Sequence, residues 1–390
     1  MNQSKSDLPQ GSKRVVAQIM TTARTLSFID GHLSRIADQG VEYHVIANFD
    51  ATNYEVGNLR HHVGLSRRIL SLGDVKAIWE IRRMLKEIQP ELVIVSTPKA
   101  SLIGAVAKCL LFRKVQTIFL VRGFRFPTLT GIRRWLVRRM ETLPSYLVDE
   151  ILVTSKETGK TLGKLVGKKN AKKIRVVLNG TGNGIDIEHF SPDNTNLRKR
   201  SDVRADLNVS SEHFMVLAVG RICIDKGFQE LVEAFEIASS KVKNMRLVVV
   251  GEYYQPDALP QSVIDKLEDR AHLVGRVPNR DLPEILNAAD LFVYPSRREG
   301  FGVAAIEAAA MRLPTLAARV GGLQSAVREN YSGEFFEPMN ALDLADRLVH
   351  LATDPETLQN LREKCRPYAV EHFDERLYDK FWMEIYKPSS

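Results

Sequence analysis

Residues 214–239 read FMVLAVGRICIDKGFQELVEAFEIAS, and this stretch decides the fold class. A β-branched apolar run ends near Gly220, a polar loop follows, and a helical pattern begins near Lys226. The same alternation recurs along the chain, in runs such as RVVAQIM, YHVIAN, ELVIVST and VQTIFLV before it, and MRLVVVGE, AHLVGRV, LFVYPS and PTLAARV after it. Short apolar strands that alternate with helices predict α/β architecture, with parallel sheets covered by helices on both faces.

The domain organisation follows from a polar interval, Asp193 to His213, that separates two series of this pattern. A chain of 390 residues is long enough for two cores. We therefore predict a Rossmann-like, doubly wound domain over 14–192, a linker over 193–212 and a second Rossmann-like domain over 213–365. The segment 366–390 is helical in pattern and rich in aromatic residues, so we expect it to pack back towards the first domain.

Composition excludes several classes of protein. Hydrophobic residues make up 44% and charged residues 26%, as in globular proteins. The three cysteines (Cys109, Cys223 and Cys365) form no CxxC pair, which argues against a disulfide framework. No apolar run approaches the roughly 20 residues that span a bilayer, and the polar start is unlike a signal peptide. We expect a cytoplasmic protein.

The first half of the chain is basic. Residues 1–200 hold 33 lysines and arginines against 17 acidic residues, and the densest group places Arg133, Arg134, Arg138 and Arg139 around Trp135. Such a helix suits an anionic membrane surface, although an ordinary solvated helix face has the same composition. Nucleic acid would also attract it, but no RRM, KH or helix-turn-helix signature is present, and we expect no nucleic-acid partner.

Two loops that follow predicted strands hold candidate binding residues. Arg221 and Lys226 bracket the first loop, and an arginine fork and a lysine point charge are two ways to hold phosphate oxygens. Two ordinary surface cations would look the same in sequence.

The second loop opens the stretch SRREGFGVAAIEAAAM, residues 296–311. Gly300 and Gly302 allow close approach of backbone amides to a ligand, and Glu299 stands at the mouth of the loop. Glu307 interrupts an otherwise apolar helix and needs a hydrogen-bond partner, which is either a protein arginine or amide or the hydroxyls of a ligand. Cations and carboxylates at one sheet edge suit a nucleotide diphosphate joined to a polyol.

These motifs resemble the family 4 retaining glycosyltransferases of the GT-B fold. The resemblance rests on the seven residues between Glu299 and Glu307, on GRICIDKG at 220–227 and on NGIDIEHFSP at 183–192, and it extends over residues 14 to 386. It implies two Rossmann-like domains that face a cleft. It also implies that Arg221 and Lys226, with the amides of Gly302 and Val303, bind the donor diphosphate, and that the two cations stabilise its developing charge. The donor sugar would be bound by Glu299, Phe301 and Gly302, and the ribose hydroxyls by Glu307.

The resemblance also implies the chemistry. The donor is a nucleotide sugar, with UDP expected, and neither a cofactor nor an essential metal is needed. The chain has no D-x-D or HExxH motif and no paired His/Cys ligands. A donor phosphate oxygen would accept the proton of the acceptor, so no dedicated protein base is required.

The acceptor side departs from the family pattern. Arg122-Gly123 stands where relatives often have His-Gly, and the loop at Thr25 lacks the usual glycines, so Arg122, Thr25 and Lys99 are weak candidates for acceptor contacts. STPKASLIGAVAKCL, residues 96–110, resembles the branch that builds bacterial surface polysaccharides on polyprenyl-diphosphate-linked acceptors. Two alternatives are open: transfer to a soluble acceptor such as a sugar phosphate, and a nucleotide-sugar-binding homologue without turnover.

Overall fold

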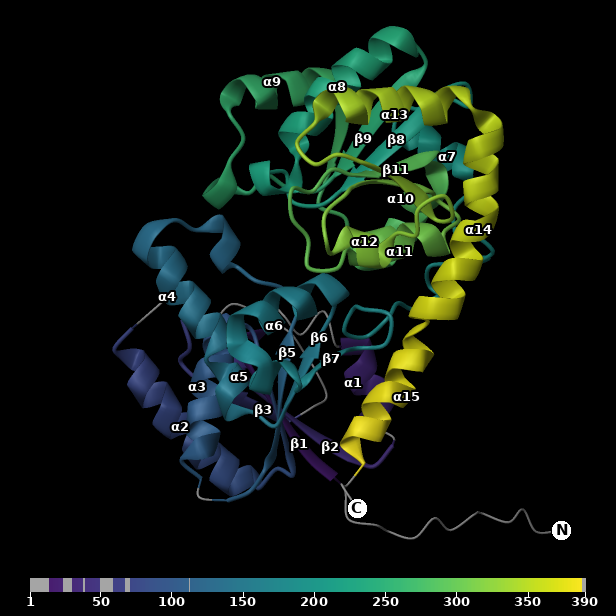
Figure 1. Cartoon of the computed structure of the whole chain (residues 1–390). Helices are drawn as coiled ribbons and strands as arrows, with labels where there is room; N and C mark the ends of the chain where they lie inside the picture. The colour runs from purple at the N-terminus through teal and green to yellow at the C-terminus, as the bar shows by residue number, and fades with distance from the viewer. Residues whose placement is uncertain are drawn as a thin grey trace, which may run out of the picture. The chain divides into compact units, whose positions relative to one another are not determined.

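The computed structural model describes residues 14–387 except 24–29, 38, 50–58, 67–70 and 112 (Figure 1). The chain divides into two compact units. The first comprises Met1–Leu152, Leu162–Arg175 and Asp379–Ser390, and the second comprises Val153–Thr161 and Val176–Tyr378.

The first sheet has seven strands in the order β3-β2-β1-β4-β5-β6-β7. β1 pairs in parallel with β2 on one side and with β4 on the other, so the strand order reverses direction between β1 and β4. The strands are β1 (Arg14–Thr22), β2 (Val41–Asn48), β3 (Leu59–His62), β4 (Leu92–Ser96), β5 (Gln116–Val121), β6 (Glu150–Val153) and β7 (Ile174–Val176).

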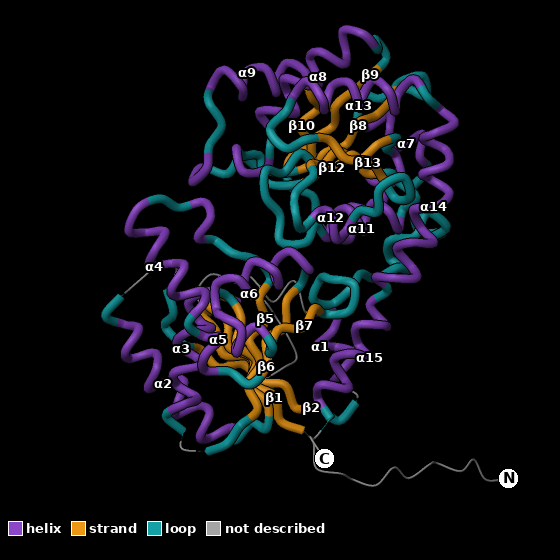
Figure 2. The backbone as a smooth tube through the Cα atoms, viewed as in Figure 1, coloured by secondary structure: helices purple, strands orange, loops and turns teal. Residues whose placement is uncertain are grey.

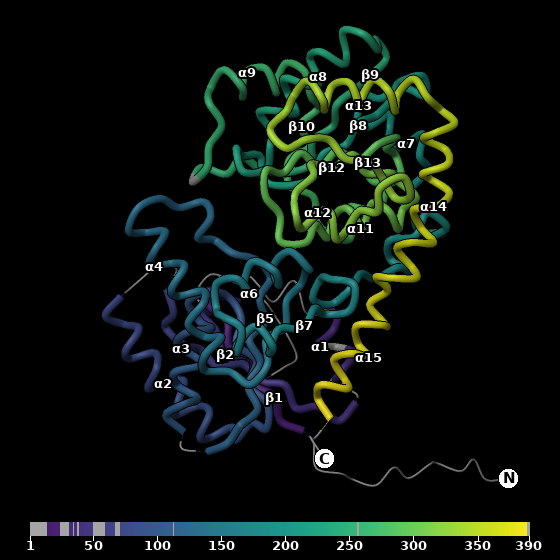
Figure 3. Tube along the Cα trace, viewed as in Figure 1, coloured from purple at the N-terminus to yellow at the C-terminus, as the bar shows by residue number. Residues whose placement is uncertain are grey.

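The helices around this sheet are short to medium in length. α2, α3 and α4 lie beside one another on one side of the sheet, and α1 lies on the other side (Figure 3). Their bounds are α1 (Asp30–Ala37), α2 (Gly73–Ile88), α3 (Pro98–Cys109), the 3-10 turn η2 (Phe126–Thr128), α4 (Gly131–Thr142), α5 (Pro144–Leu147) and α6 (Lys156–Ala171).

The second sheet has six strands in the order β10-β9-β8-β11-β12-β13 (Figure 2). β8 is parallel to both β9 and β11, so here the order reverses between β8 and β11. Ligands of open α/β sheets bind at the carboxyl ends of the strands beside such a reversal. The strands are β8 (Phe214–Val219), β9 (Met245–Val250), β10 (Ala271–Gly275), β11 (Leu291–Tyr294), β12 (Thr315–Ala318) and β13 (Gly333–Phe336).

Helices cover both faces of the second sheet, which explains why β8, β9 and β11 are almost continuously apolar. α8 packs with α9 and α13, while α11 packs with α12 and α14 (Figure 1). The bounds are α7 (Arg200–Asp206), η3 (Ile224–Lys226), α8 (Phe228–Lys241), η4 (Gln255–Asp257), α9 (Gln261–Arg270), η5 (Asn279–Asp281), α10 (Leu282–Ala288), α11 (Val303–Ala310), α12 (Leu323–Ala326), α13 (Ala341–Thr353), α14 (Pro355–Phe373) and α15 (Glu375–Tyr386).

The C-terminal aromatic segment docks by polar and aromatic contacts within the first unit. The imidazole of His32 lies 2.8 Å from an Asp379 carboxylate oxygen and 3.0 Å from the Tyr386 hydroxyl. Arg35 also pairs with Asp379. The ring of Trp382 stacks on that of Tyr386. Of the segment 366–390, residues from Asp379 onwards belong to the first unit, whereas residues 366–378 belong to the second.

The polar interval 193–212 belongs to the second unit and contains a helix, α7. Arg204 of this helix is buried and donates to the backbone oxygens of Ala288 and Ser210 and to the Asp290 carboxylate. Arg200 and Arg362 also pair with Asp290. This interval thus packs against α10, with charged contacts to Asp290 that a reading of its hydrophobic pattern does not detect.

Candidate active site

Two loops of the second unit meet at the reversal of strand order, one between β8 and α8 and the other between β11 and α11. Their backbones approach so closely that a Cβ atom on Gly227 would lie 2.0 Å from the Pro295 carbonyl oxygen. Gly227 also has a φ of 72°, a left-handed conformation that favours glycine. Tertiary structure thus places side by side two loops that are about seventy residues apart in the sequence.

The ammonium group of Lys226 pairs with the carboxylate of Glu299 across these loops. Both side chains are 17% exposed. The same carboxylate accepts hydrogen bonds from the Tyr294 hydroxyl, at 2.9 Å, and from the Gly300 amide, at 3.1 Å. Burial alone would raise the pKa of Glu299, but the Lys226 charge and these hydrogen bonds hold the pKa below its ordinary value. Glu299 is therefore ionised at neutral pH.

Arg221 extends the cationic surface at the end of β8. It is exposed, and its guanidinium carbon lies 4.2 Å from the centre of the Tyr254 ring. A guanidinium group that stacks on an aromatic ring keeps its planar face ordered while its N–H groups stay available at the edge. Arg221 and Lys226 thus present two cations from one loop.

The amino-terminal end of α11 offers unused backbone donors. Within the described part of the chain, the amides of Phe301, Gly302 and Val303 donate to no acceptor. Gly302 caps the helix with a φ of 100°, and a Cβ there would lie 2.5 Å from the Leu323 side chain. Helix amino termini with free amides attract anions and hydroxyl oxygens. The amide role at Gly302 and Val303 stays a prediction, and both amides are free to take it.

The Phe301 side chain is a structural residue of this loop. It is 5% exposed and packs with its ring 5.6 Å from that of Phe373. Gly180 lies directly against it, since a Cβ on Gly180 would come within 2.3 Å of the Phe301 ring. Only the backbone amide of Phe301 is therefore available for the sugar contact that was expected at this residue.

Glu307 lies on α11 among buried apolar neighbours and is itself partly exposed. Its carboxylate makes no hydrogen bond or ion pair with the residues that the structure describes. Burial raises the pKa of Glu307 to about 7. The arginine or amide partner that the sequence left open is thus not found in the described part of the chain, and ligand hydroxyls stay as the alternative.

Several residues of the site were missed in the sequence. Tyr294, at the end of β11, and Tyr254 support the charged groups described above. Asp225 accepts from the Arg298 guanidinium at 3.1 Å, and Arg297 pairs with the buried Glu230 at 2.5 Å. The charge alternation in IDKG and SRREG is the only signal that could have indicated this pairing.

The acceptor candidates lie in the first unit. Lys99 is 5% exposed; it pairs with Asp74 at 2.6 Å and donates to Ser66 at 3.3 Å, so it is not the surface lysine that was the other reading of this position. Arg122 directly follows β5, and burial lowers its pKa to about 10, which leaves it charged. Thr25 lies outside the described residues.

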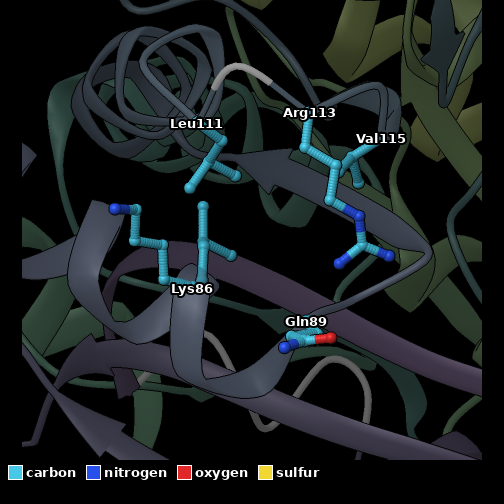
Figure 4. A pocket seen from close by; sticks show the side chains of 6 residues that line it. Lys86, Gln89, Leu111, Arg113 and Val115 are labelled. Atoms are coloured by element: carbon cyan, nitrogen blue, oxygen red, sulfur yellow. The ribbon is translucent and has the colours of Figure 1, made fainter.

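A pocket in the first unit lies away from the candidate site residues. Figure 4 shows a pocket in the first unit, lined by Leu85, Lys86, Gln89, Leu111, Arg113 and Val115. It lies where α2 ends and β5 begins, whereas the candidate residues follow the carboxyl ends of strands. Among the described residues, no group of three or more His, Cys, Asp or Glu side chains has the geometry to hold a metal ion. None of the described helices is long and apolar enough to cross a membrane.

Both halves of the chain match models of glycosyltransferase families. Residues 199–371 match the model of glycosyl transferases group 1, and residues 29–182 match the model of Glycosyltransferase Family 4. The chain is 25% identical over 372 residues to the capsular polysaccharide biosynthesis glycosyltransferase CapM of Staphylococcus aureus, covering 95% of each. It is 31% identical over 233 residues to the D-inositol 3-phosphate glycosyltransferase of Corynebacterium glutamicum, covering 58% of this chain and 54% of that protein.

Solved structures show the same fold. Anabaena HepE, in complex with UDP and glucose, superposes with a TM-score of 0.76 at 17% identity and covers 96% of this chain and 99% of that one. The sucrose-phosphate synthase of Thermosynechococcus elongatus gives a TM-score of 0.79 at 20% identity, over 96% and 98% of the two chains. The two halves of the chain therefore match two glycosyltransferase family models, and the chain has the GT-B fold.

Proposed function

We propose that this protein transfers a sugar, with retention of configuration, from a UDP-sugar to a lipid-linked glycan precursor in surface polysaccharide biosynthesis. The observation that supports this most strongly is the Lys226–Glu299 pair at the strand reversal, beside the free amides of α11. A diphosphate needs cations and amide donors, and a sugar needs a carboxylate that accepts from its hydroxyls. This site holds both within one unit, and relatives include a capsular polysaccharide enzyme and a protein crystallised with UDP.

The roles of the residues follow from their positions. Lys226 and Arg221 bind the diphosphate and stabilise the negative charge that grows on it as the bond to the anomeric carbon breaks. Glu299 binds hydroxyls of the donor sugar, and Glu307 binds the ribose hydroxyls. As the bond from the acceptor oxygen to the anomeric carbon forms, the acceptor proton moves to a departing phosphate oxygen, so no protein side chain has to remove it.

Metal independence is part of the proposal. Two cations directed at the diphosphate supply the charge neutralisation that a divalent ion supplies in metal-dependent transferases. Sugar transfer should persist when EDTA chelates all divalent metal ions in the assay. Loss of turnover in EDTA, followed by recovery with manganese, would contradict this part of the proposal.

The lipid-linked acceptor is supported by the surface of α4. Ile132 is 69% exposed and Trp135 is 52% exposed, and Arg139 lies over the Trp135 ring at 5.6 Å. The one acidic residue of the helix, Glu141, is turned inwards and accepts from the Arg125 and Phe126 amides. The outer face of α4 is therefore cationic and apolar, as in proteins that lie on anionic membranes. We propose a peripheral position on the cytoplasmic face of the membrane.

A soluble acceptor is the second candidate. It is favoured by the 31% identity to an enzyme named for inositol 3-phosphate, although that match covers little more than half of either chain. A homologue without turnover is disfavoured, because Arg221, Lys226 and Glu299 are present and the last two are paired.

Calorimetry with UDP tests the site directly. We expect UDP to bind and Lys226→Met or Arg221→Ala to weaken binding about tenfold or more, because each removes a charged contact to phosphate. Asp346→Asn, which changes an exposed residue of α13, is the matched control. Unchanged UDP affinity in both site variants would remove the diphosphate assignment. A panel of nucleotide sugars, followed by thermal shift, then identifies the donor.

A further inference from the structure

Three loops of the second unit are joined at one residue, Asp225. Its amide donates to the Asp257 carboxylate at 2.7 Å, in the loop after β9. Its backbone oxygen accepts from the Arg297 amide at 3.0 Å, in the loop after β11. Its carboxylate accepts from Arg298 at 3.1 Å. The loops that follow β8, β9 and β11 thus converge on the residue that directly precedes Lys226.

Two further contacts tie the loop after β11 to the segment that contains Gly227 and the start of α8. Arg297 pairs with Glu230, which is 6% exposed and lies in the first turn of α8. The Pro295 carbonyl is pressed against Gly227. Asp225–Arg298 is a further ion pair across the loops after β8 and β11, and its two residues directly precede Lys226 and Glu299 in the sequence. Its two side chains are 24% and 33% exposed.

We propose that Asp225 is a positioning residue: with Arg298 and Asp257 it holds the short turn η3 so that the Lys226 ammonium stays directed at the diphosphate site beside Glu299. This rests on the function proposed above. Without the carboxylate, η3 loses its ion pair with Arg298 and keeps its backbone contacts and the Lys226–Glu299 pair. A displacement of Lys226 by about an ångström is enough to weaken a charged contact strongly. Asp225 itself need not touch the donor.

The test uses UDP affinity, measured by calorimetry, in two backgrounds. Asp225→Asn removes the ion pair but keeps the size of the side chain and the backbone contacts. We expect it to weaken UDP binding about fivefold in the wild-type background and by less than about twofold in Lys226→Met, because its effect passes through Lys226. Arg298→Gln should reproduce the loss, and the double variant Asp225→Asn/Arg298→Gln should bind no worse than either single variant.

Two outcomes would overturn the inference: UDP affinity unchanged in Asp225→Asn, or equal losses in both Lys226 backgrounds. A purely structural role would lower the melting temperature without this dependence on Lys226, so thermal unfolding of each variant is measured in parallel. Asp346→Asn breaks an exposed pair with Lys241 and serves as control. If UDP does not bind the wild-type protein, the proposed function fails; if Lys226→Met weakens binding but Asp225→Asn does not, only the present inference fails.

Discussion

At the scale of single residues, Glu299 and Glu307 differ in what surrounds their carboxylates. Glu299 has a cation, a phenol and an amide as partners, whereas Glu307 has no partner among the described residues. These different surroundings give the two carboxyl groups different pKa values: that of Glu299 lies below its ordinary value, and burial raises that of Glu307 to about 7. Two glutamates eight positions apart thus have pKa values that are shifted in opposite directions.

Glu307 should make folding stability depend on pH. Its native carboxyl keeps a proton up to about pH 7, against 4.5 for the ordinary value, so the native state binds more protons between these pH values. The free energy of unfolding should therefore fall as pH rises from about 4.5 to about 7, by about 3 kcal/mol, and level off above. Glu307→Gln should abolish this contribution and gain stability at pH 8, measured by urea unfolding. The exposed Glu384→Gln is the control, and parallel pH curves for wild type and Glu307→Gln would contradict the prediction.

Glu299→Gln should separate turnover from nucleotide binding. The change removes the ion pair of Lys226 but keeps the shape of the side chain, so the ammonium becomes free for the diphosphate. We expect UDP affinity to be unchanged or higher, while sugar transfer falls by about a hundredfold, since the role proposed for the carboxylate is to bind the reacting sugar. Calorimetry and single-turnover transfer assays measure the two effects. Wild-type transfer in this variant would contradict the role of Glu299.

At the scale of elements, the site depends on how two strand–loop–helix segments fit together. β8 and β11 are adjacent strands, so the loops that follow them open on the same edge of the sheet. Glycines at 227 and 302 permit the close contacts and left-handed φ angles that these loops need. Side chains at either position would separate groups that have to act together.

Gly227→Ala tests this fit, and Gly275→Ala is a matched control. Both glycines have similar φ angles, 72° and 78°, but a Cβ on Gly227 would meet the Pro295 oxygen at 2.0 Å whereas one on Gly275 would meet nothing within 4 Å. Both changes should cost about 1 kcal/mol of backbone strain. Only Gly227→Ala should also weaken UDP binding, because it forces the two loops apart. Equal UDP affinities in the two variants would refute the role of this contact.

At the scale of the whole molecule, charge divides the chain. The basic first half includes the exposed α4 face, while the residues proposed to bind the nucleotide lie in the second unit. The comparisons support transferase membership for both halves, and the name of one relative connects it with capsular polysaccharide.

Membrane binding can be measured without substrate. The wild-type protein should sediment with vesicles that contain phosphatidylglycerol, because the arginines of α4 are attracted to anionic lipids and its apolar side chains insert between them. It should sediment much less with phosphatidylcholine vesicles, which lack net charge, or at high salt, which screens the attraction. Ile132→Ala/Trp135→Ala should reduce the bound fraction severalfold, whereas Leu342→Ala, equally exposed on α13 at 66%, should not. Equal sedimentation of all three proteins would rule out α4 as the docking surface, and a salt-sensitive shift of RNA would favour the nucleic-acid alternative.

The sequence by itself determined the alternation of strands and helices, the two parallel sheets and the pair of loops that hold Arg221, Lys226, Glu299 and Glu307. These follow from local periodicity and from residue chemistry, which act over a few turns of chain. The packed helix α7 in the interval 193–212 escaped that reading, because this short helix is held in part by the long-range ion pair of Arg204 with Asp290, which local periodicity does not show.

Only the tertiary structure decided which charges pair. Lys226 and Glu299 are far apart in sequence, and nothing in either loop shows that Glu299 is paired while Glu307 is not. The pairs Asp225–Arg298 and Lys99–Asp74 likewise join residues that are far apart in the sequence. The physical reason is the same in each case: the energy of a charge depends on burial and on its nearest opposite charge, and strand order, not sequence order, brings those neighbours together.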